Sequence, residues 1–218
     1  MQADIKGNRA FSYLDVVLEP GEQLIASSRA IFAFDNDLIW QNCFKGGFWR
    51  AFLARCLSGE PLFVARIVNS MPQTGGLALA HTVPGEIVCA HLHNHSLCLR
   101  SDAFIAATPG IKINLEYAGF TSWFAKEGLF RTCISGSGTL WFGAAGVLQE
   151  SDIDRELVIA NHRLVSYDAS LRLKHQLQGS FLSRLFGGNG VVTRIQGAGK
   201  VVTQMQSVAH TALWIDQG

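Results

Sequence analysis

The sequence predicts an all-β protein, a single two-sheet β-sandwich with one or two short helices. Three observations lead to this fold class. Apolar and polar residues alternate with the period of a strand, Pro-Gly pairs stand between apolar segments, and extended helical periodicity is scarce. At 218 residues, with 48% hydrophobic residues, the chain has enough apolar material for one large β domain.

The turns are marked by three Pro-Gly pairs, Pro20-Gly21, Pro84-Gly85 and Pro109-Gly110. Proline fixes φ for the second residue of a type II turn, and glycine accepts the positive φ that the third residue needs. Each pair lies between apolar segments, so we expect each to connect two strands.

The clearest strand is LRLKHQLQ, residues 171–178. Its apolar residues and one histidine share one face, and its basic and amide residues share the other, as in an antiparallel strand with one buried face. Residues 62–70, 156–168 and 200–208 are also predicted to contain strands, although their alternation is less regular.

The best helix candidate is FWRAFLARCL, residues 48–57. Phe48, Phe52 and Cys56 follow one another at a spacing of four residues, which places them on one side of a helix. Gly59 is expected to end it.

An internal echo relates two distant segments. Residues 52–67 (FLARCLSGEPLFVARI) align with residues 181–195 (FLSRLFGGNGVVTRI) with one deletion, and SDAFIAATPGIKI from Ser101 is a weaker third version. We therefore expect one domain, residues 1–218, made of pseudo-repeated halves at roughly 10–110 and 111–215. Chance similarity between apolar strands is the alternative.

The charge balance bears on partners. The chain has 18 basic and 17 acidic residues, and charged residues make up only 16% of it. Binding to phosphate backbones needs a surplus of Lys and Arg, so we expect no DNA partner. The N-terminus has no apolar signal segment, and no run of about 18 apolar residues suggests a spanning helix.

The five cysteines are odd in number and form no C-x-x-C pair. This spacing indicates neither a disulfide framework nor a zinc site. We expect mostly buried free thiols in a reducing compartment, consistent with a cytoplasmic protein.

The stretch CAHLHNHSLCL, residues 89–99, places His91, His93 and His95 at alternate positions. Side chains two residues apart on a strand point the same way, and two imidazoles could share a metal. No glutamate follows to complete a ligand set, so we predict no metal and no cofactor here. Three interpretations stay open: a strand face that can contact another subunit, a pH-sensitive interface, and a metal site.

Catalytic and nucleotide motifs fail on inspection. GAGK at Gly197 has Val201 where a P-loop needs Ser or Thr, and CISGSGTL does not fit G-x-S-x-G around either serine. Glu22, Glu60 and Glu86 lie in or beside turns, where solvated carboxylates are the ordinary case. The sequence predicts no catalytic residues.

Several longer blocks carry a resemblance to a known family: GGFWRAFLARCLSGEPLFVARI, VPGEIVCAHL, EGLFRTCISGSGTLWFGAAG and GAGKVVTQMQS. Together with SDAFIAATPGIKI they resemble successive blocks of the family named for altered inheritance of mitochondria, number twenty-four, over residues 13–207. The resemblance implies a β-sandwich similar to the tryptophan RNA-binding attenuation protein (TRAP), whose fold assembles into rings. It implies no enzyme activity, and the family's mitochondrial member is implicated in inner-membrane organisation.

The attenuation protein binds RNA through a lysine–lysine–arginine set, and the basic residues of this chain are spread singly, so RNA binding is not carried over. We expect a non-enzymatic, homo-oligomeric scaffold or binding protein whose protein partner is unknown. The alternatives are a metal- or small-ligand-binding protein using His91, His93 and His95, and an RNA-binding ring protein. Peripheral membrane association stays open.

Overall fold

The computed structural model describes residues 1–42, 64–100, 102–117, 130–160, 163–177 and 191–205. Strands and turns make up these residues, with no α-helix among them. The all-β prediction is therefore confirmed. The helix predicted over residues 48–57 lies outside the described residues, as do Cys43, Cys56 and Glu60.

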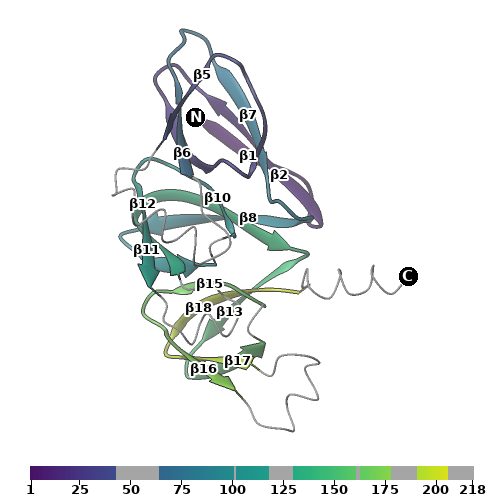
Figure 1. Ribbon diagram of the computed structural model, residues 1–218, viewed down its shortest axis with the longest axis vertical. Helices are drawn as coiled ribbons and strands as arrows, with labels where there is room; N and C mark the ends of the chain where they lie inside the picture. The colour runs from purple at the N-terminus through teal and green to yellow at the C-terminus, as the bar shows by residue number, and fades with distance from the viewer. Residues whose placement is uncertain (43–63, 101, 118–129, 161–162, 178–190, 206–218) are drawn as a thin grey trace, which may run out of the picture.

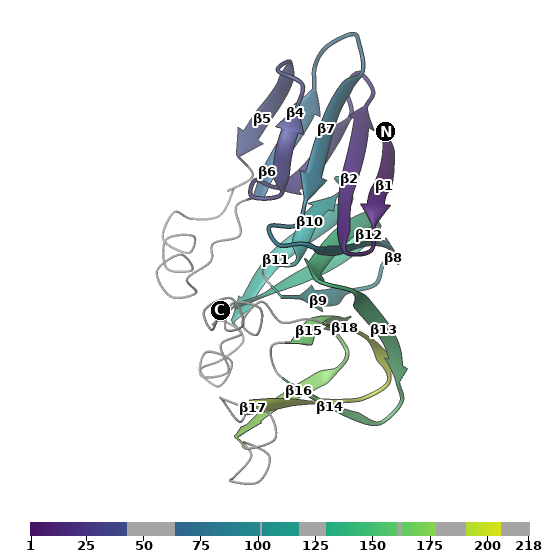
Figure 2. The same cartoon turned by 90° about the vertical axis from the view of Figure 1, so that its right-hand side faces the viewer.

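The described strands form three hydrogen-bonded sheets, and the 11-stranded one bends at β12, which gives the fold four layers. In Figures 1 and 2 layer 1 lies at the top and layers 3 and 4 lie at the bottom, while β5 and β6 of layer 2 stand beside layer 1. Layer 1 has the order β1 (Gln2–Asn8), β2 (Phe11–Leu18), β7 (Gly75–Ala80), β4 (Ile31–Phe34). Layer 2 contains β5 (Leu38–Asn42), β6 (Val64–Asn69), β3 (Gln23–Ser27), β10 (Phe104–Ala107), part of β12 (Phe130–Ala145) and β8 (Gly85–His93).

The other two layers complete the stack. Layer 3 contains β11 (Ile111–Tyr117), the rest of β12, β9 (Leu97–Leu99), β15 (Leu164–Asp168), β18 (Gly199–Gln204) and β13 (Leu148–Ile153). Layer 4 has the order β14 (Glu156–Ala160), β17 (Val191–Gln196), β16 (Arg172–Leu177).

The 16-residue strand β12 belongs to two layers at once. Its first part pairs with β11 and β9, and from Ser137 onward it pairs with β8 and β10. Gly136 and Gly138, at the changeover, both have positive φ. A Cβ on Gly138 would also lie 2.2 Å from the Thr108 hydroxyl, so only glycine lets the strand pass from layer 3 to layer 2 at this point.

Three hydrophobic cores separate the layers. The core between layers 1 and 2 includes Leu14 and Trp141, and the core between layers 2 and 3 includes Phe104 and Leu140. The third core lies between layers 3 and 4 and includes Ile195. The central strands of layers 2 and 3, such as β10 and β9, are thus buried on both faces. The sandwich prediction is confirmed, with more layers than the two expected, whereas the likeness to the RNA-binding attenuation protein stays a prediction.

The Pro-Gly pairs connect strands, but for different reasons. The Glu22 N–H donates to the Glu19 carbonyl and Gly21 has φ of 80°, as a type II turn requires. Gly85 and Gly110 are not among the residues with positive φ. A Cβ on them would lie 1.8 and 2.2 Å from the carbonyl oxygens of Ala144 and Ser137, so these two positions need glycine because backbones approach closely.

The strand predicted at 171–178 corresponds to β16, which begins directly after the buried Leu171 and in which Leu173 is half-buried and Arg172 and Lys174 are exposed. The segments that carry the internal echo lie mostly outside the described residues, and their described ends fall in β6 and β17. The division into pseudo-repeated halves therefore stays a prediction.

Candidate functional site

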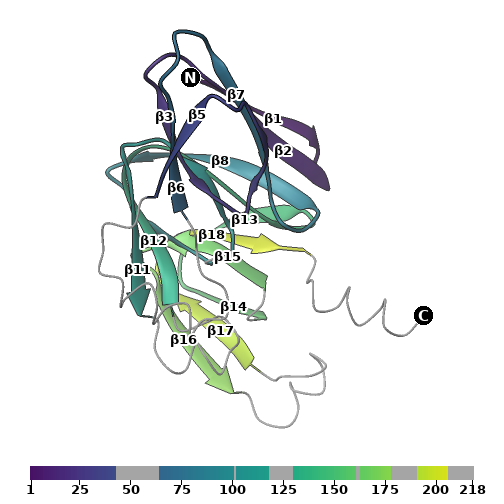
Figure 3. The same ribbon diagram turned by 45° about the horizontal axis from the view of Figure 1, so that its top comes forward.

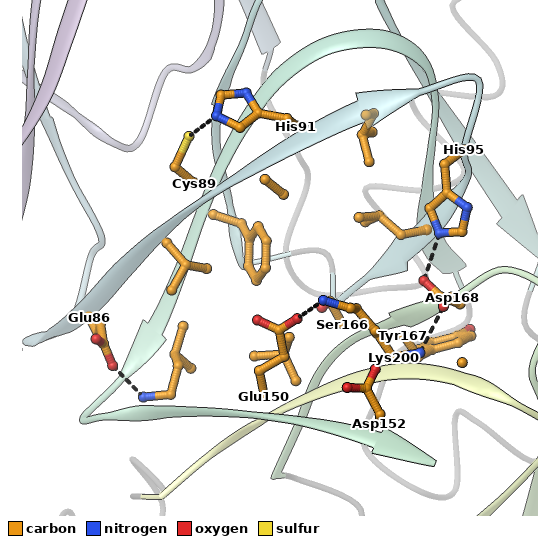
Figure 4. A pocket seen from close by; sticks show the side chains of 18 of the residues that line it. Glu86, Cys89, His91, His95, Glu150, Asp152, Ser166, Tyr167, Asp168 and Lys200 are labelled. Atoms are coloured by element: carbon orange, nitrogen blue, oxygen red, sulfur yellow. Dashed lines mark hydrogen bonds and ion pairs between the residues drawn. The ribbon is translucent and has the colours of Figure 1, made fainter. Parts of the chain in front are cut away.

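A groove of about 970 Å³ opens between β8 of layer 2 and the strands β13, β18 and β15 of layer 3 (Figure 4). β8 and the residues that lead into β13 start side by side, because the Glu86 N–H donates to the Gly146 carbonyl and the Gly146 N–H to the Pro84 carbonyl. β8 and β13 belong to different layers, so they separate beyond this point. In Figure 3, β8 runs below the β1–β2 hairpin, which it contacts.

The floor of the groove is apolar. Side chains of β8 at even positions point toward layer 3, so Val88, Ala90 and Leu92 pack against the core between layers 2 and 3. Phe142 and Val202 line the groove from the neighbouring strands. The rim of the groove is polar and includes the charged side chains Glu150, Asp152 and Lys200.

At the narrow end, Glu86 joins three parts of the chain. Arg9, from the β1–β2 turn, donates to its Oε1 at 2.7 Å, and the Leu148 N–H of β13 donates to its Oε2 at 2.8 Å. Burial raises the pKa of Glu86, but the hydrogen bonds from Arg9 and Leu148 outweigh this and hold the pKa below its usual value. Glu86 is therefore a structural anion and not the solvated turn carboxylate expected from its position after Pro84-Gly85.

At the opposite end, Asp168 joins β15, β18 and the β8–β9 connection. The His95 Nε2 lies 2.7 Å from Asp168 Oδ1, and the Lys200 N–H donates to Asp168 Oδ2 at 2.7 Å. The Lys200 ammonium also donates to Glu150 at 2.6 Å, which raises the pKa of the lysine. A Cβ on Gly199 would lie 2.7 Å from the Asp168 carboxylate, so the GAGK segment provides room for this contact.

The structure separates the three histidines. His91 and His93 are exposed on β8, and the His91 Nδ1 lies 3.2 Å from the Thr139 hydroxyl. Asn94, with φ of 52°, turns the chain before His95, which faces Asp168 instead (Figure 4). Within the described ranges no group of three His, Cys, Asp or Glu side chains could hold a metal ion.

A second surface feature lies where layers 1 and 2 end. β4 and β5 follow one another in the chain and form the last strands of their sheets. Phe32 and Phe34 on β4 and Ile39 and Trp40 on β5 are exposed, and the Phe34 and Trp40 rings meet edge to face at 4.9 Å. We call these four residues the aromatic edge.

Comparison with known proteins identifies the family of the chain. The family model for mitochondrial biogenesis AIM24 matches residues 3–206. The chain belongs to the AIM24 family. The family prediction made from the sequence blocks is thereby confirmed.

Two streptococcal proteins are similar to this AIM24 protein, one in sequence and one in structure. The uncharacterised protein M6_Spy0233 of Streptococcus pyogenes is 27% identical over 159 residues, which span 72% of this chain and 63% of that protein. The crystal structure of protein SPYM3_0169 from Streptococcus pyogenes is similar with a TM-score of 0.79 and 23% identity, over 99% of this chain and 98% of that one. In the part of the AIM24 chain that the structure describes, no helix is long and apolar enough to cross a membrane.

Sequence reasoning missed Asp168, Lys200 and Glu150 as parts of one site because each lies on a different strand. It also missed His81, whose Nδ1 accepts a hydrogen bond from the Val83 N–H at 3.3 Å and whose Nε2 donates to the Asp102 carbonyl at 3.1 Å. Burial lowers the pKa of His81, so it is a neutral structural group at neutral pH. The position of His81 between two strands offers no sequence signal for this role.

Proposed function

We propose that this AIM24 protein is a non-enzymatic, cytoplasmic scaffold that works as a homo-oligomer, with the aromatic edge as its self-association surface. The exposure of four large apolar side chains on two successive strands supports this proposal. Phe34 and Trp40 meet edge to face, whereas Ile39 precedes Trp40 on β5 and points to the opposite face of that strand, so the exposed side chains surround the edge on more than one face. Apolar groups exposed at a sheet edge commonly mark protein interfaces, because their contact with water is unfavourable.

The backbone at this edge is also suited to pairing with another chain. Among the described strands, β4 pairs only with β7 and β5 only with β6, so each has one side without a strand partner. A strand with a free side can add a second strand, and a two-fold axis would join two identical edges with every contact made twice. A second copy of this chain is therefore the occupant that we propose.

The net charge also favours contact between identical copies. With a formal charge of +1, two chains carry little overall repulsion at neutral pH. The four residues of the aromatic edge are uncharged, and the exposed Asp35 and Asp37 lie beside them in the connection between β4 and β5, so a self-association contact must leave these two carboxylates in water.

Size-exclusion chromatography with light scattering tests the proposal at micromolar concentration and pH 8. We expect a mass that is a multiple of 23.8 kDa for the wild-type chain. Ile39→Ser should shift the population toward the monomer, because Ile39 is 47% exposed within the aromatic edge. Ile5→Ser is the matched control, since Ile5 is 41% exposed on β1, the opposite end of layer 1. A wild-type monomer, or equal effects of the two substitutions, would refute this assignment.

A second candidate function is small-ligand binding in the groove. The observation that favours it is the apolar floor of Val88, Ala90 and Leu92 beneath a polar rim. An apolar fluorescent dye, anilinonaphthalene sulfonate, should bind to the wild-type protein and lose most of its signal in Ala90→Phe. Ile5→Phe, at an exposed position of β1 outside the groove, is the control and should leave this signal unchanged.

A further inference from the structure

Two buried cysteines from separate strands of layer 3 face each other. Cys98 on β9 and Cys133 on β12 are direct register partners in an antiparallel pair. Their sulfur atoms lie 2.7 Å apart. Non-bonded heavy atoms pack at about 3.5–4.0 Å, whereas a disulfide bond measures about 2.03–2.05 Å. The two thiols are therefore much closer than ordinary packing neighbours.

The backbone geometry suits a cross-link. Opposed residues in an antiparallel pair have Cα atoms about 4.5 or 5.5 Å apart, and both values lie within the range of about 4.4–6.8 Å found for disulfides. Joining the sulfur atoms therefore needs a movement of a fraction of an ångström and no change of register. Formation of the disulfide would leave the pairing of the two strands unchanged, because β9 and β12 are already hydrogen bonded to each other.

The surroundings restrict the chemistry to this pair. Cys98 is 1% exposed and Cys133 is 8% exposed, and both belong to the core between layers 3 and 4, together with Tyr167 and Leu171. The remaining described cysteine, Cys89, is exposed on β8, where its nearest polar contact is the His91 ring at 3.9 Å. A small oxidant that reaches Cys133 would thus find Cys98 beside it.

We propose that Cys98 and Cys133 form a reversible intramolecular disulfide, with a peroxide as the oxidant. The more exposed Cys133, as thiolate, attacks one peroxide oxygen, which breaks the O–O bond and leaves a sulfenic acid and hydroxide. The Cys98 thiol then attacks that sulfur, the S–S bond forms, and the sulfenic oxygen leaves as water. In total two thiols are oxidised by two electrons, one hydrogen peroxide is reduced, and two waters result. A dithiol reverses the reaction by thiol–disulfide exchange.

The test exposes the folded full-length protein to hydrogen peroxide, then alkylates free thiols in denaturant and maps the peptides by mass spectrometry. We expect the peptides of Cys98 and Cys133 to appear cross-linked and to become alkylatable again after dithiothreitol. The thermal unfolding midpoint should rise on oxidation, because the cross-link restricts the unfolded chain between residues 35 apart.

Matched variants separate this pair from general thiol oxidation. Cys89→Ser should keep both the cross-link and the rise in midpoint, and Cys133→Ser should lose both. If a buried serine prevents folding, the peptide map of the wild-type protein still decides. The proposal is overturned if Cys98 and Cys133 stay alkylatable while Cys89 becomes oxidised, or if either one cross-links mainly to another cysteine.

Discussion

Replacing Gly85 by alanine should destabilise the protein at the narrow end of the groove. The new Cβ would lie 1.8 Å from the Ala144 carbonyl oxygen and 2.9 Å from the Gly146 nitrogen. Both contacts are with backbone atoms, so no side chain can rotate away to relieve them. β8 must therefore move relative to the end of β12.

The magnitude follows from what this movement breaks. The bonds from the Glu86 N–H to Gly146 and from the Gly146 N–H to Pro84, at 2.8 and 3.1 Å, hold the two segments together. Each hydrogen bond contributes roughly 0.5–1.5 kcal/mol, and inserting a methyl group into a packed site costs roughly 1–3 kcal/mol. We expect Gly85→Ala to lower the free energy of unfolding by about 2–6 kcal/mol.

Gly76→Ala provides the matched control, since Gly76 also lies in a strand. Its Cβ would meet only the Asp35 carboxylate, at an ordinary 3.5 Å. Alanine restricts the unfolded chain, so this variant should be neutral or up to about 1 kcal/mol more stable. Urea unfolding followed by far-UV circular dichroism measures both free energies. If the two free energies agree within about 0.5 kcal/mol, β8 can move away from Ala144 without losing its two hydrogen bonds to Gly146, and the reasoning fails.

Three further predictions concern other parts of the molecule. Phe104→Ala should cost about 3–5 kcal/mol in urea unfolding, because Phe104 is fully buried in the core between layers 2 and 3; a loss below about 1 kcal/mol would contradict this placement. Asp168→Ala should cost about 1–3 kcal/mol, since it leaves the Lys200 N–H without its acceptor, and an unchanged unfolding midpoint would contradict it. His81 has a lowered pKa in the folded state, so the unfolded chain binds more protons as pH falls below about 6.5, and stability declines there. The thermal midpoint of His81→Gln should fall less than that of the wild type between pH 7.5 and 5.5, and parallel losses would exclude this contribution.

The sequence predicted the strands best where one face of a sheet meets water. β16 in layer 4 shows alternation where its side chains are described, because Leu173 turns inward between the exposed Arg172 and Lys174. β10 carries the run FIAA, in which all four residues are buried, since Phe104 and Ile105 enter different cores. A strand buried on both faces loses its alternation, so its period cannot indicate how many layers cover it.

The candidate site was harder to predict because long-range register decides it. Asp168 meets Lys200 only after β15 pairs with β18, and His95 meets Asp168 only because Asn94 turns the chain out of the β8 line. Gly85 illustrates a related difficulty, since the Pro-Gly pair predicts a connection correctly and gives the wrong reason for the glycine. A close approach between backbones and a positive φ both require glycine, so the sequence does not distinguish one reason from the other.

The layered fold also changes what the composition means for assembly. Few charges and many apolar residues suggested surfaces that a single core could not hide, and hence an oligomer. Yet layers 2 and 3 meet water mainly at their rims, and their packing accounts for many buried residues, including alanines such as Ala103, Ala107 and Ala144 that fit between large side chains. A four-layer monomer thus needs few charged residues, and low charge alone does not favour an oligomer. The oligomer proposal therefore depends on the aromatic edge, where apolar side chains remain exposed after all three cores are filled, and on the difference between Ile39→Ser and Ile5→Ser.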